Sequence, residues 1–217
     1  TLCSFISIFV VLNREAHNDR AWAEEFVKTP ATTIADGKVT ITNVRDWTYA
    51  KGATLSRDWI DQVTVDPADI VQAWFMVEPS PEWHAVAHTY LSFEFKDGTV
   101  LSLSVEARRR NGENYSPILG LFRKYELTYS WGTERDFLAR RILLLNHSVY
   151  MYPLILKEGT AAKIFLALAD TTADLAEHPG FYNTLTANCT DVLAETVNSI
   201  FPHKLPYDIS WNFPGSS

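Results

Sequence analysis

Residues 88–107, HTYLSFEFKDGTVLSLSVEA, contain the clearest structural pattern of the 217-residue chain. Apolar and polar side chains alternate in two runs, as they do in strands that turn one face toward a core. The segment Lys96-Asp97-Gly98 lies between the runs, and a short glycine-containing segment in this position predicts a β-hairpin. Gly98 suits the left-handed conformation that a three-residue hairpin loop requires.

The length of this loop determines which residues face each other across the hairpin. With three loop residues, Phe95 pairs with Thr99, and counting back along both strands places Glu106 opposite His88 on the same face. A two-residue loop would place Ala107 there instead. The three-residue loop therefore predicts a carboxylate beside the ring of His88.

Further strand-like and helical segments lie on both sides of the hairpin. Strand patterns cover residues 38–44, 72–77, 124–131 and 149–156, and helical patterns cover residues 14–28, 133–141, 158–177 and 188–200. These elements mix without a regular strand–helix–strand order. The sequence therefore predicts an α+β domain rather than a doubly wound parallel sheet.

The composition limits the classes of function. Hydrophobic residues make up 47% of the chain, which is enough for the core of one domain. The net charge of −7 argues against sequence-independent binding of nucleic acid, which needs a basic surface, so no nucleic-acid partner is expected. Two cysteines are too few for a disulfide framework.

The first residues form an uncharged apolar run, TLCSFISIFVVL, that is shorter than the about 20 residues needed to span a bilayer. The chain starts at Thr1 rather than at Met, so residues 2–12 are interpreted as the tail of a signal anchor or of a transmembrane helix. A buried N-terminal strand is the alternative, but a strongly polar stretch follows at once. We therefore expect residues 1–13 to end a membrane anchor and residues 14–217 to form a single domain.

Cys189 stands where a reactive thiol could be activated. In residues 181–192, FYNTLTANCTDV, Asn188 is a favoured N-cap residue, which would make Cys189 the first residue of a helix. A thiol in the first turn feels the positive end of the helix dipole, which stabilises the nucleophilic thiolate. The free N–H groups there could also form an oxyanion hole. The alternative is a buried, inert cysteine.

A nucleophilic thiol needs a base, and His88 is the strongest candidate among the six histidines because a strand would fix its ring. Glu106 would orient that ring and stabilise its protonated form. The alternatives are a half-buried structural His88 and a Glu106 that pairs with Arg108 or Arg109 at the surface.

The sequence predicts neither a metal nor a cofactor. Zinc ligands come in closely spaced pairs, and no such pair occurs beyond His84 and His88, of which the second starts a strand. Nucleophile-elbow, phosphate-loop and dinucleotide-binding motifs are also absent from the sequence.

Six blocks of the sequence, in this order, resemble the Lnb N-terminal periplasmic domain family. The blocks are ITNVRDWTY (41–49), HTYLSFEFKDG (88–98), LSVEARRRNGENYSP (103–117), TERDFLARR (133–141), VYMYPL (149–154) and FYNTLTANCT (181–190). The resemblance extends from about Asn18 to about Val192. It implies a circularly permuted papain-like (NlpC-like) fold with a central antiparallel sheet, in which the histidine precedes the cysteine.

The resemblance also implies roles for individual residues. Cys189 would be the nucleophile, His88 the base and Glu106 the orienting acid. The other residues of the blocks are expected to build the pocket or support the structure: Asn43, Arg45, Arg108, Tyr115, Glu134, Arg135, Asp136, Tyr182, Asn183 and Asn188.

The function that the resemblance implies is a membrane-anchored acyltransferase of the bacterial cell envelope, with its domain in the periplasm. It would take an acyl chain from a phospholipid as a cysteine thioester and hand it to the N-terminal amine of a lipoprotein. Two alternatives remain open: a cysteine peptidase or amidase that acts on cell-wall peptide, and a non-catalytic binding domain on the same scaffold.

Overall fold

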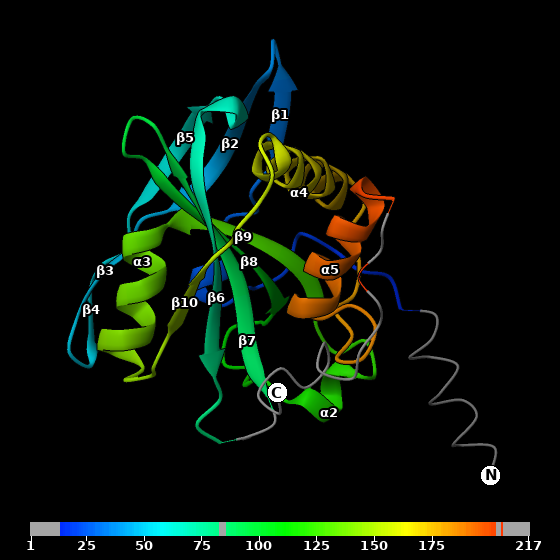
Figure 1. Cartoon of the computed structure of the whole chain (residues 1–217). Helices are drawn as coiled ribbons and strands as arrows, with labels where there is room; N and C mark the ends of the chain where they lie inside the picture. Colours follow the sequence, from blue (N-terminus) through cyan, green and yellow to red (C-terminus); the bar gives the residue numbers. More distant parts are fainter. Residues whose placement is uncertain (1–13, 83–85, 203–204, 206–217) are drawn as a thin grey trace.

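The computed structural model describes residues 14–82, 86–202 and 205 (Figure 1), so the expected membrane anchor at residues 1–13 lies outside the described residues. Its centre is an eight-stranded, mostly antiparallel sheet in the order β1-β2-β9-β8-β7-β6-β10, with β5 paired to β2. The strands are β1 (Thr32–Ala35), β2 (Lys38–Arg45), β5 (Trp59–Val65), β6 (Ile70–Pro79), β7 (Ala87–Phe95), β8 (Val100–Arg108), β9 (Glu126–Thr133) and β10 (Tyr150–Pro153). This mixed α+β architecture is the fold class that the sequence predicts.

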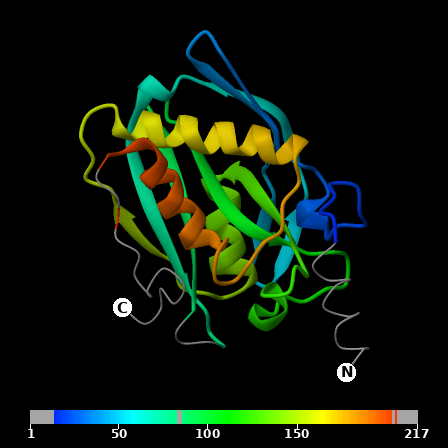
Figure 2. The same cartoon turned by 90° about the vertical axis from the view of Figure 1, so that its right-hand side faces the viewer.

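The remaining elements surround this sheet. They are the hairpin β3 (Thr48–Ala50) and β4 (Ala53–Ser56), the 3₁₀ turns η1 (Glu24–Phe26) and η2 (Pro67–Asp69), the helices α2 (Pro117–Gly120), α3 (Glu134–Ala139), α4 (Thr160–Glu177) and α5 (Cys189–Ile200), and the π-helical turn η3 (Arg140–Leu144). Figure 2 shows α4 and α5 lying together over one face of the sheet. Helix α3 packs on the other face, where Phe137 contacts Tyr90 of β7. The sheet is therefore covered by helices on both faces.

The hairpin of β7 and β8 has the predicted three-residue loop. Gly98 has a φ of 85°, its N–H donates to Phe95 O, and the N–H of Phe95 donates to Thr99 O, both at 2.9 Å. The register that follows pairs Tyr90 with Ser104. Even-numbered residues of β7 therefore turn toward α3, while odd-numbered ones such as Phe93 pack against Phe165 of α4.

The two strands of this hairpin part before the hairpin ends. Their ladder stops at Tyr90 and Ser104, yet β7 stays paired with β6 as far as Ala87, and β8 stays paired with β9 as far as Arg108. The open end of the hairpin is therefore a split in the sheet, with His88 on one side and Glu106 on the other.

The expected helix at residues 14–28 is wrong, because only the short turn η1 forms there. The segment lies along the end of β8 instead. Trp22 forms an antiparallel bridge with Arg110, the N–H of Ala23 donates to Arg109 O at 3.0 Å, and Asn18 Nδ2 donates to Ala176 O at 2.9 Å. These tertiary hydrogen bonds outweigh the helical propensity of the segment.

A buried ion pair ties α3 to the sheet. Arg45 Nε and Nη2 donate to the two carboxylate oxygens of Asp136 at 2.9 and 3.0 Å, and the side chains are 6% and 0% exposed. Asp136 also accepts from the N–H of Trp47 and the hydroxyl of Tyr49. Arg45 therefore supports the structure, which is one of the two roles that the sequence predicts for it.

We predict that Arg45→Met lowers the free energy of unfolding by about 3–5 kcal/mol, because it leaves the Asp136 charge buried without its cation. Urea unfolding followed by far-UV circular dichroism measures the change. The matched control is Arg57→Met, since Arg57 pairs with Glu24 at the exposed surface and contributes little there. Equal unfolding midpoints for the two variants would contradict the structural role of Arg45.

Candidate active site

Helix α5 begins at Cys189 because Asn188 caps it. Asn188 Oδ1 accepts from the N–H groups of Thr190 and Asp191 at 2.9 and 3.0 Å, and its Nδ2 donates to Thr184 O and to Asp191 Oδ2 at 2.9 and 2.7 Å. The N-cap that the sequence predicts is therefore confirmed. Cys189 is 8% exposed, and among the described residues it is a free cysteine.

One ring nitrogen of His88 contacts both the hydroxyl of Ser104 and the carboxylate of Glu106. Its Nε2 lies 2.6 Å from Ser104 Oγ and 3.3 Å from Glu106 Oε1. The Ser104 hydroxyl donates to Glu106 Oε1 at 2.7 Å, so it accepts from His88. Glu106 thus faces His88 as the hairpin register requires, and the alternative pairing with Arg108 or Arg109 does not form. The sequence interpretation missed Ser104, although it lies on the face of Glu106, two residues away.

Cys189 and His88 shift each other's pKa in opposite directions. Burial by itself would lower the pKa of His88, but the charges of Glu106 and Cys189 raise it to about 10. Burial would raise the pKa of the Cys189 thiol, but the charge of His88 and a hydrogen bond with it bring that pKa below its ordinary value. Because Nε2 is engaged by Ser104 and Glu106, Nδ1 is the ring nitrogen left for the sulfur. The site can therefore hold a thiolate beside an imidazolium.

The split between β7 and β8 lets these groups meet. His88 shares a face with Tyr90, on the side of α3, whereas Cys189 belongs to the helix layer on the opposite face. The hydroxyls of Thr89 and Thr190 are 3.0 Å apart, which fixes the start of α5 against the start of β7. The mutual influence of Cys189 and His88 on their pKa values is consistent with a meeting of the two side chains where the strands have parted.

A cavity of about 380 Å³ opens at the split. It is lined by Glu78, Pro79, Ser80, Pro81, Glu82, Val86, Ala87, His88, Val105, Glu106, Ala107, Arg109, Tyr115, Pro117, Arg140, Leu145, His147, Tyr182 and Cys189. The three proposed catalytic residues share this cavity with two of the expected pocket residues, Tyr115 and Tyr182. The hydroxyls of these tyrosines are 3.2 Å apart, and burial together with the charge of Cys189 raises the pKa of Tyr182.

Two other expected pocket residues lie elsewhere. Arg108 points away from the cavity, stacks on the ring of Trp22 at 4.3 Å and donates to Phe26 O at 2.7 Å. Asn183 shapes the turn before α5, since its Oδ1 accepts from the N–H groups of Leu185 and Thr186. Both residues support the structure around the site, which is the second of the two roles expected for them, and neither lines the cavity.

An ionic cluster missed by the sequence interpretation lies beside His88. Arg141 Nε donates to Glu78 Oε2 at 2.7 Å, and Arg141 Nη2 lies 3.8 Å from Glu106 Oε1. His147 Nδ1 is 2.6 Å from Glu78 Oε1. Glu78 pairs with His88 across β6 and β7, so long-range sheet register brings the cluster to the site.

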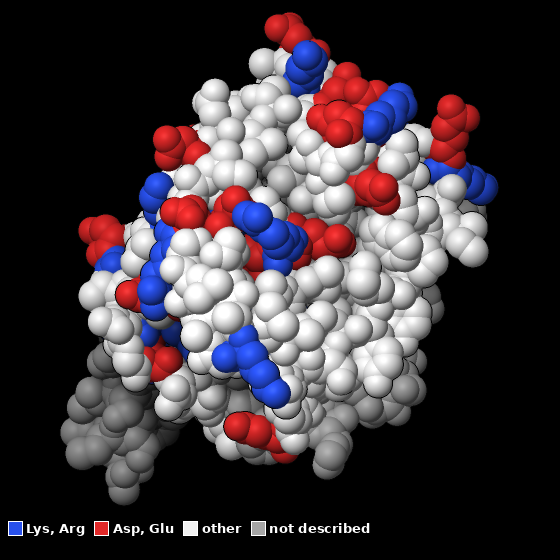
Figure 3. Space-filling view, turned by 90° about the vertical axis from the view of Figure 1, so that its left-hand side faces the viewer, with Lys and Arg blue, Asp and Glu red and all other residues white. Residues whose placement is uncertain are grey.

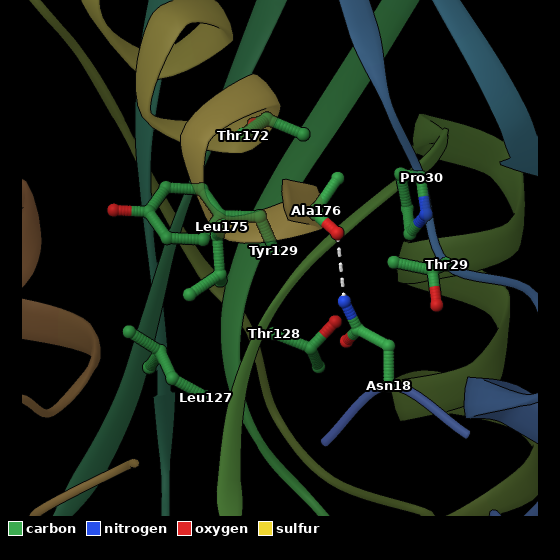
Figure 4. Close-up of a pocket in the computed structure, with 9 residues that line it drawn as sticks. All are labelled: Asn18, Thr29, Pro30, Leu127, Thr128, Tyr129, Thr172, Leu175 and Ala176. Carbon is green, nitrogen blue, oxygen red and sulfur yellow. Dashed lines mark hydrogen bonds between the residues drawn. The ribbon is translucent and has the colours of Figure 1, made fainter. Parts of the chain in front are cut away.

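Two other hollows differ from this cavity. The pocket in Figure 4 lies between the strand β9 and helix α4, is lined by residues such as Asn18, Tyr129 and Thr172, and measures only about 10 Å³, which is room for about one water molecule. A second hollow, of about 600 Å³, includes Arg123 and Asn183. Neither hollow contains His88 or Cys189, so the cavity at the split is the candidate active site.

One face of the surface, shown in Figure 3, bears Lys and Arg interspersed with Asp and Glu, without a continuous basic area. Among the described residues, no helix combines the length and the hydropathy that crossing a membrane requires.

Nothing matches the chain in comparisons with curated proteins and with solved structures. Residues 56–212, well over half of the chain, match the family described as the Lnb N-terminal periplasmic domain. The chain therefore belongs to the Lnb N-terminal periplasmic domain family, as the periplasmic domain of an Lnb-type protein.

Proposed function

We propose that this domain is a thiol acyltransferase that moves an acyl chain from a phospholipid, through a thioester on Cys189, to the N-terminal amine of a lipoprotein. The observation that carries the proposal is that Cys189, His88 and Glu106 line one 380 Å³ cavity, where the pKa of His88 is raised and that of Cys189 is lowered. The order of histidine before cysteine supports a circularly permuted papain-like scaffold. The proposal includes a membrane anchor at residues 1–13.

The chemistry has two half-reactions. The Cys189 thiolate attacks the ester carbonyl, and the His88 imidazolium gives its proton to the departing alkoxide, which leaves a thioester and a lysophospholipid. The amine of the lipoprotein then attacks the thioester, and neutral His88 takes the proton from it. The N–H groups of Thr190 and Asp191 already donate to Asn188. We therefore assign oxyanion stabilisation to the N–H of Cys189 and to the hydroxyl pair of Tyr115 and Tyr182.

An apolar surface at the mouth of the cavity supports a lipid substrate. Pro117, which lines the cavity, begins α2, and the next residues are exposed: Ile118 is 63% and Phe122 57% exposed. The loop before α5 is fixed to this surface by a hydrogen bond from Thr184 Oγ1 to Pro117 O at 2.7 Å, and it adds exposed Leu185. Such a surface beside a catalytic thiol suits contact with a bilayer.

A peptidase or amidase that acts on cell-wall peptide is the second candidate. The observation in its favour is the charged wall of the cavity, to which Glu78, Arg140 and His147 contribute. Such groups could position a polar peptide. The two candidates differ in what the Cys189 thioester carries, an aliphatic chain or a peptide acyl group.

We predict that Cys189→Ala abolishes formation of an acyl-enzyme and that His88→Ala lowers its rate by at least about 10³-fold. Glu106→Gln should lower the rate less than His88→Ala, because the amide still orients the ring but does not stabilise its charge. Intact mass spectrometry after incubation with phospholipid measures the adduct on each purified variant. A Glu106→Ala variant with full activity would remove Glu106 from the site.

The charged pair also predicts a pH dependence. The pKa of Cys189 is lowered and that of His88 is raised to about 10, so the pair is present above the first value and is lost as the pH rises through the second. Iodoacetamide should therefore alkylate Cys189 at pH 6 faster than it alkylates an ordinary thiol, whose pKa is about 8.5. Glu106→Gln should slow this reaction at pH 6, while Glu94→Gln, at the far end of β7, should not. Alkylation that follows the titration of a free cysteine would rule out the pair.

The lipid substrate predicts a dependence on chain length. Each CH₂ that enters an apolar environment contributes about 0.8 kcal/mol, or about fourfold in kcat/KM. Phospholipids with acyl chains of increasing length, kept below their micelle-forming concentrations, should therefore show progressively higher kcat/KM values. If the rates ignore chain length while the protein cleaves a soluble peptide amide, the amidase is the better description.

A further inference from the structure

Arg140 occupies a special place in the wall of the cavity. It is the first residue of the π-helical turn η3, in which the N–H of Leu145 donates to Arg140 O at 3.0 Å. A π-helical turn is rare and often marks a functional site, because it changes which side chains face a given direction. Here it places Arg140 and, beyond the turn, Leu145 and His147 along the same cavity that holds Cys189.

The guanidinium of Arg140 lacks a close partner of its own among residues 14–82, 86–202 and 205. The one carboxylate there within ion-pair distance is Glu25, at 3.6 Å. Glu25 is already bound to Arg109, with 2.6 Å between Oε1 and Nη2. Arg109 also lines the cavity. Two guanidinium groups in the cavity wall therefore share one carboxylate.

The neighbouring residue, Arg141, has several close partners for its guanidinium group. Arg141 contacts Glu78 at 2.7 Å and Glu106 at 3.8 Å, and it donates to Phe137 O at 3.1 Å. Arg140 is likewise only 23% exposed, yet it has the single long contact with Glu25. Burial lowers the pKa of Arg140, and the positive charges of Arg45 and Arg141 lower it further, while the charges of Glu25 and Glu106 offset only part of this lowering. An anion at Arg140 would relieve this excess of positive charge.

The rest of the cavity indicates what kind of anion would fit. Apolar side chains, among them Val86, Leu145 and Pro117, share the cavity with Arg140. From Pro117 the apolar surface continues onto exposed Ile118 and Phe122. A ligand that contacts both Arg140 and these apolar side chains thus combines an anionic group with an aliphatic part.

We propose that Arg140 and Arg109 form an anion subsite that binds the phosphodiester group of a glycerophospholipid while its acyl ester lies at Cys189. This inference rests on the proposed acyltransferase function and names the part of the donor that the enzyme recognises. A guanidinium fork matches the oxygens of a phosphodiester, and it also matches a carboxylate. A cell-wall peptide with a free carboxylate is therefore the competing source of the anion.

Binding measured in the Cys189→Ala background tests the subsite without turnover. The probes are dihexanoyl phosphatidylglycerol below its micelle-forming concentration, uncharged dihexanoylglycerol, and an acetylated dipeptide with a free carboxylate, each titrated by calorimetry. Adding Arg140→Gln should weaken binding of the phospholipid by at least about tenfold, as expected for a charge-assisted contact, and change binding of dihexanoylglycerol by less than about twofold. Adding Arg135→Gln instead should change neither, because Arg135 is exposed and pairs with Asp46.

Other outcomes of these binding measurements would overturn the subsite or its assignment to a phosphodiester. Equal affinity of the phospholipid with and without Arg140→Gln overturns the subsite, as long as urea unfolding shows that the variant is folded. Binding of the dipeptide, but not of the phospholipid, through Arg140 overturns the phosphodiester assignment and favours the amidase. The proposed function is judged separately, by the acyl adduct on Cys189 in the wild-type protein. An adduct that forms equally well with Arg140→Gln defeats the subsite alone, whereas Arg140-dependent binding without any adduct defeats the acyltransferase alone.

Discussion

The parting of β7 from β8 beyond Tyr90 and Ser104 is the constraint on which the candidate site depends. In a continuous sheet, a side chain on one face does not reach a group on the other. His88 belongs to the face of α3, and Cys189 comes from the helix layer on the opposite face. The split removes this barrier, and it also provides the space for the cavity. Neither strand is left without support, because β6 and β9 continue to pair with their outer edges.

Arg141 stabilises the two sides of the split. It contacts Glu78 on β6 and Glu106 on β8, the strands that flank β7. One buried guanidinium thus neutralises two carboxylates that would otherwise repel each other near His88. Arg141 belongs to η3, the turn that continues α3, and Asp136 ties α3 to Arg45, so the buried ion pair of the fold also positions the ionic cluster of the site. The helix α3 and the turn η3 therefore contribute both to the stability of the fold and to the geometry of the site.

The parts of the site that follow from local rules were accessible from the sequence. The turn at Gly98 fixes the register that brings Glu106 to His88, and the preference of Asn188 for the N-cap position fixes Cys189 at the start of α5. Each of these depends on a few neighbouring residues. The position of His88 at the start of a strand singled it out among the histidines before the family resemblance was considered, and the family match confirms that resemblance.

The parts that depend on long-range packing were not accessible. Residues 14–28 have a helical pattern, but backbone groups of Arg109 and Arg110 bind the segment in extended form. Arg108 and Arg45 lie in blocks that resemble the family, and only the fold shows that one stacks on Trp22 and the other binds Asp136. Nothing in the local sequence relates Arg141 to Glu78, which are brought together by the packing of α3 and η3 on the sheet.

The charge on the Cys189 sulfur has a consequence for the timing of proton transfer. That charge is one of the influences that keep the pKa of His88 high. When the sulfur becomes part of an uncharged thioester, this influence disappears, and His88 holds its proton less firmly. In the proposed reaction, forming the covalent intermediate would thus convert the same imidazole from a proton donor into a proton acceptor. The enzyme would switch between its acid and base states through its own intermediate, with no movement of the chain required.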